Sequence, residues 1–161
     1  MKNIVVLLLI YCNILFAFDS KDLEQLKDDG DCPKCDLSHA DLRGIDLSMS
    51  DLSNADLSFA NLANTEAHKA NFANANLSYA ILIKSNLKGA KFTNAILKNA
   101  NFFEAKIWKG DFKNAQIIKC NFDESALGSA KFSGNNLTNS TFNGAILYKT
   151  NFDKNVIGIP K

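Results

Sequence analysis

A large apolar residue recurs at every fifth position from residue 37 onward, and this period constrains the fold more than any other feature. The recurring positions end in 2 or 7 and give 25 centres between Leu37 and Ile157, of which only Ala67 is small. A small residue lies two positions before most centres, as at Ala55 and Ala75. The consensus is therefore Ala-(Asp/Asn)-(Leu/Phe)-x-x, repeated without an insertion.

A period of five fits neither a straight helix nor a flat strand. On an α-helix each step of five rotates the apolar residue by roughly 140°, and on a strand an odd step alternates between the two faces. The chain must therefore turn once per repeat, so that successive coils share backbone hydrogen bonds. Both prolines, Pro33 and Pro160, lie outside the repeat block, which favours continuous pairing.

Stretches such as Ala40-Asp41-Leu42 and Ala100-Asn101-Phe102 resemble the pentapeptide-repeat family, over about three quarters of the chain. The resemblance implies an all-β fold, a right-handed quadrilateral β-helix with four repeats per coil and a short N-terminal α-helical cap. The centre and the small residue would point inward. A coil of four repeats would stack one column of phenylalanines and place a second column opposite, respectively Phe72, Phe92, Phe112, Phe132 and Phe152, and Phe102, Phe122 and Phe142.

Both ends of such a solenoid of about six coils need a cap. We assign residues 18–34 to an N-terminal cap, with a short helix over residues 20–27 that places Leu23 and Leu26 on one side. The repeats occupy residues 35–159, and residues 160–161 form a tail. Because so little chain follows the last centres, the final coil is a candidate surface for a homodimer, formed by Phe142, Leu147, Phe152 and Ile157.

The first residues are typical of an export signal. Lys2 precedes an apolar run of fifteen residues, Ile4 to Phe18, which is shorter than the roughly 20 residues of a membrane-spanning helix. We predict a signal peptide at residues 1–17, cleaved after Ala17, and a periplasmic or extracellular protein without a stable membrane span. An uncleaved anchor is the alternative, because Leu15 is an imperfect residue for the cleavage motif.

Charge is distributed unevenly along a chain that is nearly neutral as a whole. The formal net charge is +1 over 161 residues, so uniform attraction to nucleic acid or membrane is not expected. From residue 18 to residue 70 there are 12 acids and 5 bases, whereas from residue 71 onward there are 5 acids and 12 bases. An elongated fold would be a dipolar rod.

Two cysteines flank the start of the repeats in the motif Cys32-Pro33-Lys34-Cys35. A redox motif or half of a zinc site would share this spacing, but no second cysteine pair or histidine pair with ligand spacing accompanies it. In an exported protein we expect a structural disulfide between Cys32 and Cys35. Cys120 occupies a small inward position several coils away and is expected to remain a buried thiol.

The run of acids Asp36, Asp41, Asp46, Asp51 and Asp56 could suggest a calcium site or catalytic carboxylates. Each of them lies at the consensus position just before a centre, so the repeat itself explains them. No phosphate-binding loop, nucleophile elbow or metal-binding histidine pair is present in the sequence. We therefore predict a protein that is not an enzyme and carries no cofactor.

Residues twenty apart share one outward column, and one such column is not explained by the repeat. We call it, together with the lysines beside it, the corner strip; it comprises His68, Lys88, Trp108 and Tyr148, flanked by Lys69, Lys109 and Lys149. Aromatic and cationic side chains together suit an anionic or sugar-like polymer or an acidic protein. A mixed surface in which Lys88 contacts Trp108 is the alternative.

The leading functional hypothesis is an exported, non-enzymatic scaffold that binds an unknown protein or envelope component. The alternative follows from the family resemblance, because some members imitate DNA and bind type II topoisomerase (DNA gyrase). Such mimicry requires a strongly negative rod in the cytoplasm. The basic second half of the chain and its export signal argue against this alternative, and no nucleic-acid partner is expected.

Overall fold

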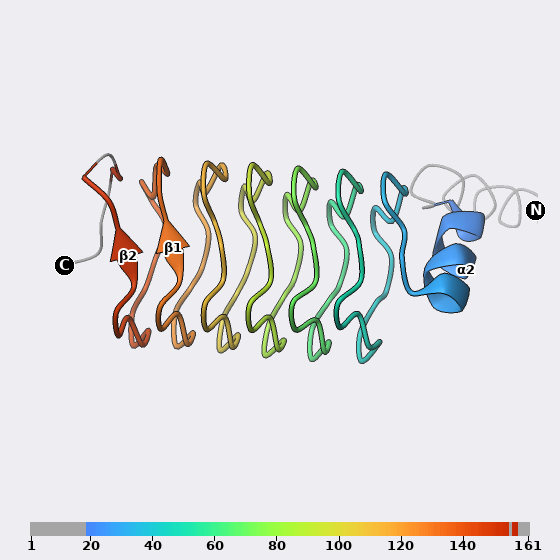
Figure 1. The fold of residues 1–161 in the computed structure, drawn as a ribbon, viewed down its shortest axis with the longest axis horizontal. Coiled ribbons are helices and arrows are strands. Elements are labelled where there is room, and N and C mark those ends of the chain that lie inside the picture. Colours follow the sequence, from blue (N-terminus) through green and yellow to red (C-terminus); the bar gives the residue numbers. More distant parts are fainter. Residues whose placement is uncertain (1–18, 155, 158–161) are drawn as a thin grey trace, which may run out of the picture.

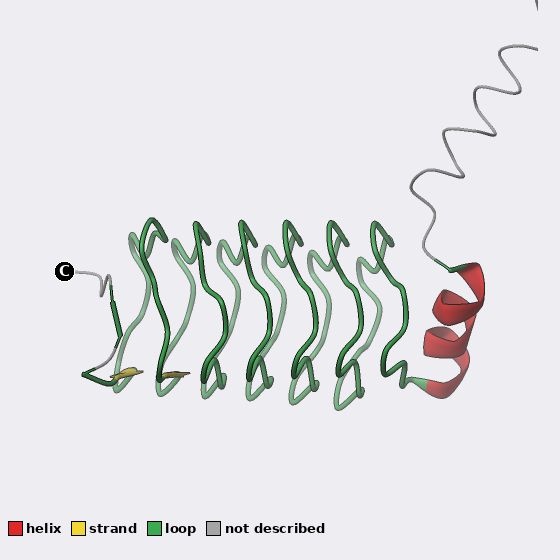
Figure 2. Ribbon diagram, turned by 90° about the horizontal axis from the view of Figure 1, so that it is seen from above, coloured by secondary structure: helices red, strands yellow, loops and turns green. Residues whose placement is uncertain are grey.

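The computed structural model describes residues 19–154, 156 and 157, which form one elongated solenoid with a helix at its N-terminal end (Figure 1). The helix, α2, comprises Ser20–Asp29. Two short strands near the other end, β1 (Lys131–Phe132) and β2 (Asn151–Phe152), pair in parallel. Most of the solenoid is drawn as loop in Figure 2, because each side of a coil contributes only one bridging residue between turns.

The coils repeat every twenty residues, as four repeats per coil require. Parallel bridges join residues twenty positions apart, for example Asp36 with Asp56, Asn71 with Lys91, and Asn101 with Asn121. The bridges from Asp36 onward cover about six such turns. The expected spacing of the stacked columns is therefore confirmed.

Most corners of the coils are tight turns that begin at a centre. At Leu37, the carbonyl accepts a hydrogen bond from the Ala40 N–H at 3.1 Å, while the N–H of His39 donates to Ser58 in the next coil at 2.8 Å. His39 has a φ of 61°, as the third residue of a type II turn requires. Asparagine tolerates this left-handed backbone and recurs there, as Asn54, Asn74, Asn94 and Asn114.

Two phenylalanine columns fill the core of the later coils. In the first column Phe92 and Phe112 stack with ring centroids 4.9 Å apart, and Phe112 and Phe132 with centroids 4.7 Å apart. The second column, which includes Phe122, meets the first edge-on, with Phe112 and Phe122 at 5.8 Å and 89°. Both predicted columns are therefore present, and the edge contacts join them into one aromatic core.

Helix α2 covers the first coil. The Asp19 carboxylate caps its N-terminus by accepting from the Lys21 N–H, and Gly30, with a φ of 76°, ends it. Leu26 is buried against the core and Leu23 packs beside it, as predicted. The carboxylate of Asp22 accepts from the Asp36 N–H at 2.6 Å and that of Asp31 from the Asp51 N–H at 2.7 Å, so two edge donors are satisfied without a preceding coil.

The last coil departs from the five-residue register. Ile157 bridges Asn136, which lies twenty-one residues before it, and its side chain is 61% exposed, whereas Val156 is buried. The prediction that Ile157 is an inward centre is therefore wrong. One extra residue between Phe152 and Ile157 moves Val156 inward and turns Ile157 to the outside.

Candidate functional site

The corner strip occupies one corner of the solenoid over successive coils. Backbone hydrogen bonds stack its members directly: the Lys69 N–H donates to the Lys88 carbonyl at 2.9 Å, and the Lys109 N–H to the Gly128 carbonyl at 2.9 Å. Lys88 and the three flanking lysines are exposed, whereas His68 and Trp108 are half-buried. The strip is thus a continuous outer corner, but its members do not form a single site.

A surface hollow of about 490 Å³ gathers the N-terminal part of the strip. It is lined by His68, Lys69, Asn86, Lys88, Gly89 and Lys109. Gly89 lies between Lys69 and Lys109 in the same corner column, with a φ of 73° that the turn requires. Because Gly89 has no side chain, the column is open at this coil, and only the Cγ of Lys69 would lie within contact distance of an added Cβ, at 3.4 Å.

Trp108 packs away from this hollow, against the next coil. A Cβ built on Gly128 would overlap the six-membered ring of Trp108, so the indole occupies the space that a side chain at position 128 would need. Among the described residues, no cation–π contact joins Lys88 to Trp108; such a contact is found between Lys149 and Tyr148, with Nζ 5.0 Å from the ring centroid. Tyr148, which is 62% exposed, and Lys149 thus lie apart from the hollow, beyond Gly128.

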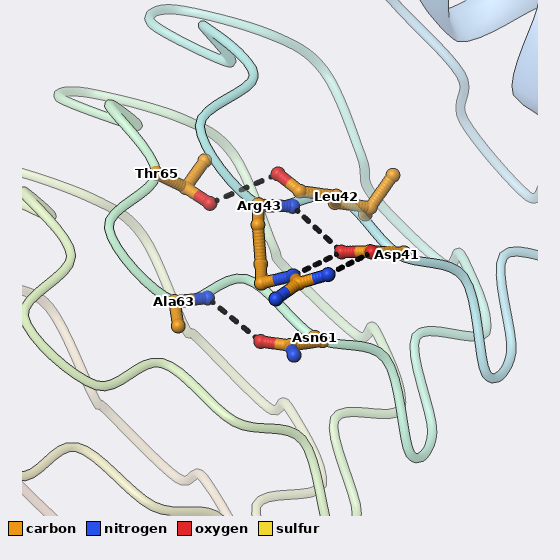
Figure 3. A network of polar contacts seen from close by, with 6 residues as sticks. All are labelled: Asp41, Leu42, Arg43, Asn61, Ala63 and Thr65. Carbon is orange, nitrogen blue, oxygen red and sulfur yellow. Dashed lines mark hydrogen bonds and ion pairs between the residues drawn. The ribbon is translucent and has the colours of Figure 1, made fainter.

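The acidic residues before the centres serve the turns, as the repeat suggested. Each side chain accepts a hydrogen bond from the backbone N–H two residues later, at 2.8 Å from Ser58 to Asp56 and at 3.1 Å from Ser38 to Asp36. Figure 3 shows the same bond between Asn61 and the Ala63 N–H, so the amide replaces the carboxylate without loss of the contact. These acids are turn residues.

A second surface hollow, of about 510 Å³, lies beside Asp41 and Arg43, near the N-terminal end. The guanidinium of Arg43 binds both carboxylate oxygens of Asp41, at 2.8 and 2.6 Å (Figure 3). This side-chain hydrogen bond, together with the bond from the Arg43 backbone, lowers the pKa of Asp41 to about 2. The cation of this hollow is therefore already neutralised, unlike the lysines of the corner strip.

A disulfide joins Cys32 and Cys35 beneath helix α2, and both side chains are buried. The two residues form a coil corner of their own, because the Cys35 N–H donates to the Cys32 carbonyl and the Lys34 N–H to Ser53 in the next coil. A centre and the small position three residues later both point inward, so their thiols face each other across the turn. The disulfide therefore has a structural role, because it links the two ends of the first corner.

We expect one free thiol, Cys120, in the protein that lacks residues 1–17. Cys120 is buried, and this desolvation raises its pKa to about 12, so it should not react with a thiol reagent in the native state. Thiol counting without reductant should give none in buffer and one in denaturant. A count of three in denaturant would mean that the disulfide is absent.

Sequence reasoning missed a ladder of exposed rings on the corner opposite the strip. The ring centroids of His39 and Phe59 are 4.8 Å apart, as are those of Phe59 and Tyr79, with interplanar angles of 1° in both pairs. Phe59 is 48% exposed and Tyr79 51%. The signal was available in the sequence, since the three residues are twenty apart at the third position of a turn.

Two negative findings hold for the part of the chain that the structure describes. No group of three or more histidine, cysteine, aspartate or glutamate side chains is placed to hold a metal ion. None of the described helices has the length and apolar character needed to cross a bilayer. The predicted signal peptide at residues 1–17, the cut after Ala17 and the tail at residues 160–161 lie outside the described residues.

Comparison with known proteins agrees with this geometry. A family model described as pentapeptide repeats matches eight copies, over residues 35–72, 70–108, 95–134 and 120–154. Among solved structures, alr5209, a pentapeptide repeat protein from Nostoc PCC 7120, is 27% identical with a TM-score of 0.54, covering 81% of this chain and 95% of its own. A trypsin-treated variant of QnrB1, a plasmid-mediated fluoroquinolone resistance protein, is 18% identical with a TM-score of 0.54, covering 79% of this chain and 86% of its own. Comparison with curated protein sequences gives no match.

Proposed function

Because this chain belongs to the pentapeptide-repeat family, we propose that it is an exported, non-enzymatic scaffold that binds a partner through its outer surface. Proteins of this family are generally structural or interaction modules. The observation that carries the proposal is the corner strip, where exposed lysines and the half-buried His68 line a hollow that neither the core nor the turns require. The family geometry, a right-handed quadrilateral coil over residues 35–159, would present this corner rigidly.

Export is supported by the cap. The Cys32–Cys35 disulfide is buried beneath helix α2, and disulfides persist in oxidising compartments such as the periplasm and the cell exterior. The apolar run at residues 4–18 supplies an export signal of suitable length. The organisation we propose is a signal peptide at residues 1–17, a cap at 18–34, the coils, and a tail at 160–161.

Cell fractionation followed by mass measurement tests the proposal. A C-terminally tagged chain should appear outside the cytoplasm with the mass expected for cleavage after Ala17 and with one disulfide. A variant with Leu7→Arg and Leu8→Arg in the apolar run is the control, and it should stay in the cytoplasm at full length. Full-length, reduced wild-type protein in the cytoplasm would contradict the proposal.

The topoisomerase-binding alternative receives no support from the described surface. A DNA-like surface needs continuous negative charge, whereas Lys69, Lys88 and Lys109 make one corner basic. The likeness to QnrB1, at 18% identity, concerns the fold alone.

We also propose that the C-terminal coil forms a homodimer. Leu147 and Phe152 are only half-buried, and Phe142 just below them is 9% exposed. Ile157, although it points outward, adds apolar surface at the same end. These residues would pair about a two-fold axis, in which the same patch of both copies is buried.

Sedimentation velocity of the mature protein should show a dimer whose proportion rises with concentration. Replacing Phe152 and Ile157 by Asn should shift the equilibrium to monomer, because the apolar contact is lost while the central coils are untouched. Phe59→Asn, which changes an exposed ring in an early coil far from the C-terminal end, is the control and should leave the dimer unchanged. A monomer at all concentrations would contradict the proposal.

A further inference from the structure

The hollow of the corner strip has the form of a notch between two lysines. Lys69 and Lys109 occupy the same corner column two coils apart, roughly 10 Å at the usual spacing of β-strands. The position between them is Gly89, and Lys88 and His68 belong to the neighbouring column. Because Gly89 has no side chain, its coil leaves a space, and Lys69, Lys88 and Lys109 border that space.

The lysines around the notch have no ionic partner within the described residues. The two ion pairs found there, Arg43 with Asp41 and Lys84 with Glu104, are on another corner. Two acids lie near the lining of the notch: the Glu66 carboxylate accepts from the Asn86 amide at 2.6 Å, and Asp46 interacts electrostatically with His68. Neither acid forms an ion pair with the ammonium groups of Lys69, Lys88 and Lys109, which share one side of the molecule.

We propose that this notch binds an oxyanion, a phosphate or carboxylate group carried by a larger polymer. The inference rests on the proposed function, because it assigns partner binding to the same corner. Its test uses the purified protein and does not depend on export. Three ammonium groups around a space open to solvent attract a compact anion and leave room for the chain that carries it. Lysine provides several rotatable donors, which suits an anion approached from different coils.

Charge alone would allow an anion to bind at several basic surfaces of the protein. The notch distinguishes the corner strip from the others. Lys98, Lys113 and Lys119 are also exposed, but they lie on other corners and line neither of the two hollows described above. An oxyanion at the notch can contact three ammonium groups around one hollow, whereas Lys98 and Lys119 share a corner that lines neither hollow and Lys113 lies on another corner.

The test measures binding by isothermal titration calorimetry, because Trp108, the sole tryptophan, packs away from the notch. The mature protein is titrated with tripolyphosphate and, separately, with an oligogalacturonate, and a neutral maltooligosaccharide serves as the blank. Saturable binding of either anion is expected, weakening as salt rises. The probe that binds more tightly distinguishes a phosphorylated from a carboxylated source.

Two variants separate the notch from a diffuse basic surface. Replacing Lys69, Lys88 and Lys109 by Gln should weaken binding roughly tenfold, because exposed charge contacts contribute a few-fold each. Replacing Lys98, Lys113 and Lys119 by Gln makes the same change in net charge and should have little effect. Gly89→Asn keeps every charge and should also weaken binding, because its side chain fills the notch while asparagine tolerates the left-handed backbone.

Circular dichroism of each variant establishes that the coil is intact. Absence of saturable binding by both anions, equal losses in the two triple variants, or unchanged binding by Gly89→Asn would each overturn the proposal. None of these outcomes bears on export, which fractionation tests independently.

Discussion

Replacing Phe112 by Ala should lower the free energy of unfolding by about 3–5 kcal/mol, among the largest losses from any single substitution. Phe112 is fully buried and stacks on Phe92 and Phe132 at 4.9 and 4.7 Å. It also meets Phe102 and Phe122 edge-on at 6.2 and 5.8 Å. Rigid coils above and below cannot close the resulting cavity, so the full cost of the void remains. Urea unfolding followed by circular dichroism measures the change.

Phe142→Ala is the matched control for position in the stack. Phe142 stacks on Phe122 at 4.9 Å and lies near the open C-terminal end, where it is 9% exposed. Its replacement should cost less, about 2–3 kcal/mol, because Phe142 stacks on one side only and the open end allows the neighbouring residues to relax into the space. Equal losses at the two positions would contradict an aromatic core whose stability depends on stacking from both sides.

Asn101→Pro should be similarly damaging, with a loss of about 3 kcal/mol or more. The Asn101 N–H donates to the Ala80 carbonyl at 3.0 Å, and Asn101 bridges the coils on both sides. Proline removes this donor in the middle of the ladder, where neighbouring coils leave no room for the backbone to move. The melting temperature and the urea midpoint should both fall, and Asn101→Ala reports the part due to the side chain.

Proline should be tolerated three residues earlier, at Lys98. The Lys98 N–H has no hydrogen-bond partner among the described residues, and Lys98 is the second residue of a turn closed by the Ala100 N–H and the Leu97 carbonyl. Proline favours that position of a type II turn. Pro33 already occupies the equivalent position between Cys32 and Cys35. A melting temperature for Lys98→Pro as low as that for Asn101→Pro would contradict this account of the corners.

The sequence was sufficient to predict features that depend on the period. A large inward residue every fifth position predicts one turn per repeat, and the resemblance to the pentapeptide-repeat family implies four repeats, or twenty residues, per coil. Hence the positions of Phe92, Phe112 and Phe132 in one column followed from counting. The helix that covers the first coil followed from Leu23, Leu26 and Gly30.

Features that depend on one side chain filling the space left by another could not be predicted in this way. Trp108 was expected beside Lys88, but the absence of a side chain at Gly128 lets it pack on the next coil instead. Asn135 occupies a small inward position, where its amide donates to the Phe112 and Ala115 carbonyls at 2.8 Å. The five-residue period also predicted that Ile157 points inward, whereas after Phe152 the buried residue is Val156.

The extra residue in the last coil has a consequence for the behaviour of the protein at high concentration. A regular coil left open at its end would be a template on which the first coil of another molecule could pair in register, and repetition would give a fibre. Here Ile157 is displaced by one residue from the position that such pairing needs. At the other end, the carboxylates of Asp22 and Asp31 already occupy two edge donors. Neither end of the solenoid therefore favours in-register pairing with another molecule. The proposed two-fold contact would join two molecules and would not propagate to a fibre.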